Sequence, residues 1–378
     1  MMIAQKKTGT GEIMKSHLLS LAAAVAATAF AATAALAQER EVRVYNWSDY
    51  IDETILADFT KETGIKVIYD VFDSNEMLET KLLAGGSGYD VVVPTGPFLA
   101  RQIQAKVFQK LDKSKLPNLS NLWPVVSERL AKYDPGNQYA VNYMWGTTGI
   151  GYNVDKVKAA LGNVPIDSWS VLFKPENAAK LKSCGINILD ASDETFAIAL
   201  NYLGKNPDSK DTKDLEAGGA VYNKIRKSVK TFNSSAYIDE LANGDSCITI
   251  GWSGDVLQAK TRAEEAKNGV NIEFIIPKEG TYMWFDNLAI PADAKHVAEA
   301  HAFINYLLKP EVIAKASNYV QYANGNLASQ KFLDKEVLEN PSVYPPEDVV
   351  KKLFTISPYG PREQRVLNRV WTQIKTGS

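Results

Sequence analysis

The stretch EVRVYNWSDYIDETILADFTKETGIKVIYDVF, residues 41–72, predicts a strand, a helix and a second strand in succession. Apolar and polar residues alternate at both of its ends, which is the spacing of strands. Between them, Ile51, Ile55 and Phe59 fall on one face of a helix. Gly64 is placed to end that helix. A strand joined through a helix to the next strand is typical of a parallel sheet.

The same alternation continues over residues 75–107, which have the pattern of a helix, a strand and a second helix. We therefore predict an α/β fold with a parallel sheet covered by helices on both faces. Ligands of such sheets bind at the carboxyl ends of the strands. Residues 47–50, residues 73–74 and Thr95 follow predicted strands, so we expect one crevice to collect them.

A second α/β lobe is predicted after a long, glycine-rich extended stretch at residues 139–157. Strand and helix patterns restart at residues 185–266, and residues 271–291 have the pattern of a return to the first lobe. Two lobes joined by two long crossings predict a hinged cleft between them. We place lobe 1 at residues 38–145 and 276–334, and lobe 2 at residues 146–275 and 335–378.

Residues 1–37 have the features of a signal peptide. Three lysines precede the apolar run LLSLAAAVAATAFAATAALA, which ends on an A-x-A cleavage site at residues 35–37. Translation starts at Met1 or at Met14, and the second start gives a leader of more usual length. A retained membrane anchor is the alternative, but the alanine-rich run and the cleavage site favour removal. We expect the mature protein to be exported.

The two cysteines, Cys184 and Cys247, both lie in the exported part of the chain. In an oxidising compartment such cysteines are expected to pair, and two buried free thiols are the alternative. The formal net charge is −2 at pH 7. A mildly acidic balance gives no support to nucleic-acid binding, which requires a basic face.

The sequence gives little support to several kinds of catalytic and cofactor site. His296 and His301 are five residues apart, so we expect them on different, solvated faces of one helix and not as a metal pair. The sequence GWSGD lacks the second glycine of a nucleophile elbow, because Asp255 stands there. The glycine-rich stretches AGGSGYD and TTGIGYN do not match a phosphate loop or a dinucleotide fingerprint. We expect no metal and no cofactor.

Aromatic, carboxylate and hydroxyl side chains gather at the predicted strand ends. The candidates are the aromatic residues Trp47, Tyr50, Trp252, Trp284, Phe285 and Tyr322, the carboxylates Asp49, Glu194, Asp255 and Asp286, and the hydroxyls Ser48 and Thr95. An ammonium group is held over an aromatic face by the ring quadrupole and by a charge-assisted hydrogen bond to a carboxylate. A ligand with an apolar body and ammonium ends suits this set, so we predict a polyamine.

The chain resembles the periplasmic polyamine-binding proteins of bacterial ABC uptake systems, most closely their putrescine-binding branch. The resemblance covers essentially all of the mature chain and rests on VYNWSDYI, GYDVVVP, WGTTGIGYNVDKV, SWSVLFKPEN, LKSCGI, YLGKNP, LANGDSCITIGWSGDV, AKNGVNIEFIIPKEG and YPPEDV. It implies a two-lobed, hinge-closing binding protein that is not an enzyme. Such a protein delivers its ligand to the permease subunits of an ABC transporter at the inner membrane, and we expect it to be a monomer.

The resemblance also implies a set of ligand contacts. They fall on Trp47, Ser48, Tyr50, Glu194, Trp252, Asp255, Trp284, Asp286 and Tyr322, with Asp255 and Asp286 as the principal ammonium partners. Asp49 lies beside them in the sequence, and it is either a further contact or structural. Thr95 stands where the family has a serine, and Trp284 stands where the putrescine branch is expected to have a phenyl ring. Binding of spermidine is therefore expected alongside putrescine, and a preference for spermidine is one alternative.

Two further alternatives come from other classes of protein. A periplasmic hydrolase of an amine substrate would use Glu194 or Asp255 as a base. A binding protein of the same fold for a ferric or sugar-like solute is the other alternative, but iron sites favour paired tyrosines with histidine or a carboxylate.

Overall fold

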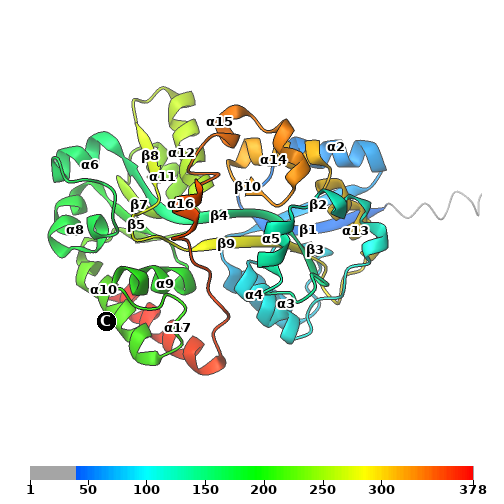
Figure 1. The fold of residues 1–378 in the computed structure, drawn as a ribbon, viewed down its shortest axis with the longest axis horizontal. Helices are drawn as coiled ribbons and strands as arrows, with labels where there is room; N and C mark the ends of the chain where they lie inside the picture. The colour runs from blue at the N-terminus through cyan, green and yellow to red at the C-terminus, as the bar shows by residue number, and fades with distance from the viewer. Residues whose placement is uncertain (1–39, 378) are drawn as a thin grey trace, which may run out of the picture.

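The computed structural model describes residues 40–377, which form two lobes (Figure 1). The predicted signal peptide lies outside the described residues. Strand β4 (Ala140–Asn153) and strand β9 (Met283–Ala289) run through the middle of the molecule, between the lobes (Figure 1). Within residues 40–377, no helix is both long enough and apolar enough to cross a bilayer.

Lobe 1 contains the first three strands of the chain and the helices that cover them. Its strands are β1 (Glu41–Trp47), β2 (Lys66–Phe72), β3 (Val91–Val92) and β10 (Ala323–Asn324). Its helices are α2 (Glu53–Thr63), α3 (Asn75–Ala84), α4 (Gly96–Gln104), α5 (Pro124–Leu130), α13 (Val297–Leu307) and α14 (Pro310–Val320), with short 3₁₀ turns η1 (Lys113–Lys115), η2 (Pro117–Asn121) and η5 (Leu327–Phe332).

The strand–helix alternation predicted from residues 41–72 is confirmed. β1 pairs in parallel with β2 and with β3, so the carboxyl ends of all three strands lie at one edge. Helix α2 begins after Asp52, whose side chain accepts a hydrogen bond from Thr54 N, and it ends at Gly64 with φ of 69°. β9 adds antiparallel to β3, so the sheet of this lobe is mixed rather than wholly parallel.

β4 is the long strand that joins the two lobes. Its first half, Ala140–Thr147, pairs antiparallel with β9 in lobe 1. Its second half pairs antiparallel with two lobe 2 strands, β7 (Ile248–Trp252) and β8 (Ile272–Ile275). The predicted extended stretch is confirmed, and all residues of β4 are buried. One continuous strand therefore holds both halves of the molecule in a common sheet.

Lobe 2 repeats the parallel α/β arrangement. Besides β7 and β8 its strands are β5 (Ile186–Ile188) and β6 (Thr231–Phe232), and β7, β5 and β6 are parallel neighbours. Its helices are α6 (Val154–Leu161), α7 (Ser170–Phe173), α8 (Pro175–Leu181), α9 (Ser192–Tyr202), α10 (Thr212–Ile225), α11 (Tyr237–Ala242), α12 (Ser253–Ala266) and α17 (Pro361–Thr376), with 3₁₀ turns η3 (Lys182–Cys184) and η4 (Arg226–Ser228).

A disulfide joins Cys184, just before β5, to Cys247, just before β7. The predicted pairing is therefore confirmed, and its sulfur atoms are 2.04 Å apart. Because β5 and β7 are parallel neighbours, the bond links the starts of two paired strands. It closes a loop with a sequence separation of 63 residues, which includes helices α9, α10 and α11.

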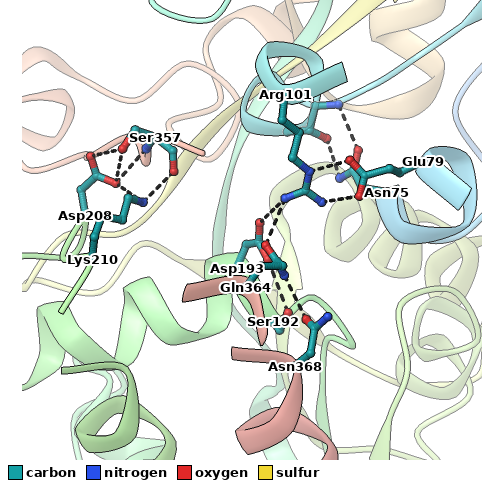
Figure 2. Close-up of polar contacts among 11 residues, drawn as sticks. Asn75, Glu79, Arg101, Ser192, Asp193, Asp208, Lys210, Ser357, Gln364 and Asn368 are labelled. Atoms are coloured by element: carbon teal, nitrogen blue, oxygen red, sulfur yellow. Dashed lines mark hydrogen bonds and ion pairs between the residues drawn. The ribbon is translucent and has the colours of Figure 1, made fainter. Parts of the chain in front are cut away.

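The last part of the chain returns from lobe 1 to lobe 2. The chain first forms α15 (Lys335–Leu338) and α16 (Glu347–Val350). The backbone of Phe354 then hydrogen-bonds to Thr281 and Met283, on either side of Tyr282, at the start of β9. Ser357 then donates to the carboxylate of Asp208, with its backbone nitrogen 2.8 Å from Oδ1 (Figure 2). Helix α17 follows beside α9 and α10 (Figure 1). The exact residues that separate the lobes stay a prediction.

The prediction of two solvated histidines is wrong. His301 lies in α13 and is 2% exposed, where its Nε2 accepts a hydrogen bond from the backbone nitrogen of Asp112 at 2.9 Å. His296 precedes that helix and is partly buried, with Nδ1 3.0 Å from a carboxylate oxygen of Asp90. Each ring therefore bonds a segment distant in the sequence, which helix periodicity alone does not reveal.

Candidate functional site

A pocket lies between the lobes at the carboxyl ends of the strands. Every predicted contact residue except Asp49 lines it. The residues that the lobe 1 strand ends bring together here are Trp47, Ser48, Tyr50, Asp73, Ser74 and Thr95. The opposite wall comes from the starts of α9 and α12. No lysine or arginine is among the lining residues, so the pocket favours a cation.

Asp286 is the carboxylate on the lobe 1 side of the pocket. It lies on β9 and is 5% exposed. The hydroxyl of Tyr50 donates to its Oδ2 at 2.8 Å, and the hydroxyl of Thr95 donates to its Oδ1 at 2.6 Å. Thr95 thus keeps the hydroxyl of the family's serine in a position to hold the carboxylate. Both oxygens are oriented by these bonds and retain lone pairs for a further donor.

Asp255 is the carboxylate on the lobe 2 side. It lies in the first turn of α12 and accepts from the hydroxyl of Tyr322 at 2.6 Å and from that of Tyr237 at 2.9 Å. Tyr322 comes from lobe 1, so this contact joins the lobes. The ring of Tyr322 lies so close to α12 that a Cβ at Gly254 would be 2.6 Å from the ring. Glycine at this position therefore permits the tyrosine to reach the carboxylate.

Glu194 is a third buried carboxylate, in the first turn of α9. The indole nitrogen of Trp252 lies 3.0 Å from its Oε1 and donates to it. The hydroxyl of Thr148, on β4, donates to Oε2. Three elements of lobe 2 therefore fix this side chain at the pocket wall.

Aromatic rings form the remaining walls. Trp47 of lobe 1 meets Trp252 of lobe 2 edge to face, with ring centroids 5.6 Å apart. Tyr322 packs against Trp284 with centroids 5.1 Å apart. The indole of Trp284 is accommodated by Gly146 on β4, where a Cβ would lie 2.7 Å from the ring. Phe285, also a candidate in the sequence, is fully buried and does not line the pocket, because successive side chains of β9 point to opposite faces.

Asp49 lies outside the pocket lining and bridges the lobes. Its φ of 53° is in the left-handed region, and its Oδ1 is 2.5 Å from Nη2 of Arg262 on α12. Arg262 also pairs with Asp239 at 2.7 Å. Asp49 is thus placed to tie lobe 1 to lobe 2 at the edge of the cleft, which suits the structural alternative for this residue.

Sequence reasoning missed several lining or supporting residues. Tyr237 and Thr148 hold the carboxylates of Asp255 and Glu194, but neither lies in the clusters that the sequence singles out. Glu76 and Asp193 also line the pocket, in the first turns of α3 and α9. The only sequence signal for Asp193 as a lining residue is that it directly precedes Glu194. None of residues 40–377 forms a group of three or more histidine, cysteine, aspartate or glutamate side chains that could hold a metal ion.

Burial sets the protonation of the three central carboxylates. Desolvation is the largest cause in each case, and it raises the pKa of Asp255 and of Asp286 from 3.8 to about 7. It raises the pKa of Glu194 from 4.5 to about 8. The hydroxyl and indole donors oppose these increases without cancelling them. A cationic ligand would therefore bind to groups that are only partly ionised at neutral pH in the empty pocket.

Two periplasmic binding proteins are similar to the chain over most of its length. The chain is 56% identical to the putrescine-binding periplasmic protein PotF of Escherichia coli (strain K12), over 90% of this chain and 93% of the relative. It is 52% identical to the putrescine-binding periplasmic protein SpuD of Pseudomonas aeruginosa (strain UCBPP-PA14), over 97% of this chain and all of the relative. These names confirm the expected periplasmic location.

Solved structures agree in fold. A spermidine/putrescine ABC transporter substrate-binding protein, PotD from Streptococcus pneumoniae, matches with a TM-score of 0.72 and 31% identity, over 89% of this chain and 99% of that one. These relatives are binding proteins of uptake systems, so they give no support to the hydrolase alternative. Residues 54–345 match the family described as bacterial extracellular solute-binding proteins. The chain, with its two lobes and interlobe pocket, belongs to this family of bacterial extracellular solute-binding proteins.

Proposed function

We propose that the protein captures putrescine in the periplasm and delivers it to the permease of an ABC-type uptake system. The pocket carries the proposal. Asp255 and Asp286 contribute one buried carboxylate from each lobe to a space with aromatic walls and no lining lysine or arginine. Relatives at 56% and 52% identity that are named as putrescine-binding proteins support the same ligand.

Two ammonium groups on a short methylene chain match the chemistry of this pocket. The nitrogens of extended putrescine lie about 6 Å apart by standard bond lengths. Each aspartate is already oriented by two hydroxyl groups and has lone pairs left for an ammonium. The aromatic walls around Trp252 and Trp284 would cover the methylene chain and contribute cation–π attraction. In this proposal Asp255 holds one ammonium and Asp286 holds the other.

Ligand binding is proposed to hold the two lobes together. A ligand shifts an equilibrium between open and closed forms only through contacts that differ between them. A diamine held by Asp255 and Asp286 contacts both lobes at once, so it favours the closed form. Protein contacts that cross the cleft, Trp47 with Trp252 and Asp49 with Arg262, would form at the same time. The permease would then recognise the closed monomer.

Isothermal titration calorimetry of the purified mature protein tests this function. We expect putrescine to bind with one site per monomer. The matched control is 1,4-butanediol, which has the same carbon chain and no charge, and it should produce no binding heat. Equal binding of the diol, or no binding of putrescine, would reject the proposal. Spermidine in the same experiment tests the alternative preference, which the indole of Trp284 favours.

A further inference from the structure

Arg101 of lobe 1 reaches across to lobe 2 beside the pocket. It lies on α4, and its guanidinium is held within its own lobe by Glu79 of α3, with Nε 2.5 Å from Oε1 and Nη2 2.7 Å from Oε2. The third nitrogen, Nη1, points toward lobe 2 (Figure 2). There it donates to Oε1 of Gln364 on α17 at 3.1 Å and forms an ion pair with Oδ2 of Asp193 on α9 at 3.8 Å. We call these four side chains the interlobe clamp.

The charged side chains of the interlobe clamp are sheltered from solvent. Those of Arg101, Glu79 and Asp193 are 17%, 19% and 9% exposed. The guanidinium also stacks on the ring of Phe98, 3.7 Å from the ring centroid. Because a two-pronged pair with a carboxylate fixes the plane of a guanidinium, Glu79 holds Nη1 in its direction toward lobe 2. A hydrogen bond from such a sheltered cation contributes more than an exposed ion pair does.

The lobe 2 half of the interlobe clamp belongs to helices that form the pocket wall. Asp193 and Glu194 are adjacent in the first turn of α9, and both line the pocket. Gln364 lies in the first turn of α17. The same helix holds a further lining residue, because Trp371 Nε1 donates to a carboxylate oxygen of Asp190 at 2.6 Å. Contacts made by the clamp therefore bear on the position of this wall.

The interlobe clamp and the pair of Asp49 with Arg262 lie on different sides of β4 and β9. Arg262 is on α12, in the upper part of Figure 1, whereas α4, α9 and α17 are in the lower part. Opening of the hinge would move α4 away from α9 and α17 and break the contacts of Nη1. Contacts that exist only in the closed form stabilise that form without touching the ligand.

We propose that Arg101 is a positioning residue that holds the lobes together around the bound amine and thereby slows release of the ligand. This inference rests on the proposed function. Arg101 itself is not among the residues that line the pocket. In the open form its guanidinium stays paired with Glu79, and on closure Nη1 gains Gln364 and Asp193. These contacts fix the first turn of α9 and so hold Glu194 at the pocket wall. The ligand leaves only after the interlobe clamp has opened.

Stopped-flow measurement of putrescine binding to Arg101→Lys tests the inference. Lysine keeps the charge, so the field at the pocket is preserved, but one ammonium does not reproduce the fork that binds Glu79 and Gln364 together. Release should be about tenfold faster, the size of one hydrogen bond to a charged group, and association should change by less than about twofold. Gln364→Ala should have a similar effect, and the double variant should release no faster than the faster single variant.

Arg369→Lys is the matched control. Arg369 lies on the same helix, α17, but its partner Glu216, at 3.3 Å, belongs to lobe 2 as well. The substitution is chemically identical to Arg101→Lys and breaks a pair that does not cross the cleft. Putrescine release from this variant should therefore match wild type.

The outcomes separate the inference from the proposed function. Release at the wild-type rate in Arg101→Lys would overturn the inference, and a lower Tm in that variant would then place Arg101 in the stability of lobe 1 alone. Additive effects of the Arg101 and Gln364 substitutions, or equally fast release from Arg369→Lys, would also overturn it. In each of these cases putrescine still binds and the proposed function stands. Absence of putrescine binding to the wild-type protein would instead reject the proposed function and the inference with it.

Discussion

Replacing Asp255 with asparagine tests the central element of the site. The substitution keeps the shape of the side chain and one oxygen acceptor for Tyr322 or Tyr237, but it removes the negative charge. The residue is 6% exposed, so an ammonium bound there would be largely desolvated. Truncating one partner of such a pair costs about 2–5 kcal/mol. Putrescine affinity should therefore fall by about thirtyfold to several thousandfold.

The same substitution should have the opposite effect on the ligand-free protein. A pKa raised from 3.8 to about 7 corresponds to about 4 kcal/mol of penalty for holding Asp255 ionised. The folded protein binds this proton more tightly than the unfolded chain does. The stability that results is fully present below pH 3.8 and is lost as the pH rises through about 7. Asparagine carries no such penalty at pH 8, but it satisfies the two tyrosines less well. We expect a net gain of about 2 kcal/mol, or a few degrees in Tm.

Calorimetry and thermal scans at two pH values measure both effects. At pH 8 the ligand-free Asp255→Asn protein should melt above wild type. Near pH 4 the ionisation penalty is absent from wild type, so the variant should melt below it, because only the cost of the less satisfied tyrosines remains. Binding of putrescine to wild type near pH 7 should release protons, because the ligand ionises the carboxyl group, and the variant should release fewer. Unchanged putrescine affinity in the variant, with the protein folded, would refute the assignment of Asp255 as an ammonium partner.

Three further predictions concern the aromatic wall, the disulfide and the cleft edge. Trp284→Phe should lower the ratio of spermidine affinity to putrescine affinity by about threefold to tenfold, because a phenyl ring gives weaker cation–π attraction. An unaltered ratio would mean that this residue does not select the length of the bound amine. Replacing Cys184 and Cys247 together by serine should lower the free energy of unfolding by about 4 kcal/mol, and denatured wild-type protein should contain no titratable thiol. Asp49→Asn should speed putrescine release by a factor of about five or less in stopped-flow experiments, because its partner Arg262 is partly exposed; a loss as large as that predicted for Asp255→Asn would instead make Asp49 a ligand contact.

Local pattern was sufficient to predict several helices and strands of this protein, but not all of them: α17 (Pro361–Thr376), for example, was not predicted. The periodicity of Ile51, Ile55 and Phe59 identified α2, and the glycine-rich stretch at residues 139–157 identified β4. These signals are local because side-chain spacing along the chain directly reflects the period of a helix or strand. Strand ends in a parallel sheet meet at one edge, which is why the residues near Trp47 and Thr95 were expected together.

Contacts between distant segments were not predictable in the same way. Nothing around Asp49 in the sequence indicates that it turns away from the pocket toward Arg262, which is 213 residues later. His301 looked like a surface residue, but it bonds a backbone nitrogen 189 residues earlier. Such partners depend on how the lobes and helices pack. A polar residue makes the same contribution to the sequence pattern whether its side chain faces water or a buried donor.

The amino-acid sequence was enough to predict the α/β alternation, the two lobes and the chemical character of the site, because each follows from local spacing or residue type. It favoured pairing of the cysteines but left two free thiols as an alternative, and the structure shows the disulfide. Only the packing of the lobes shows which carboxylate oxygens accept hydrogen bonds from hydroxyl groups. Asp286 is oriented by Tyr50 and Thr95, whereas Asp193, beside the well-bonded Glu194, keeps an oxygen without a donor. The physical reason is that desolvation and hydrogen bonding depend on the packing of elements that are remote in the chain, and adjacent residues of one helix can therefore meet different surroundings.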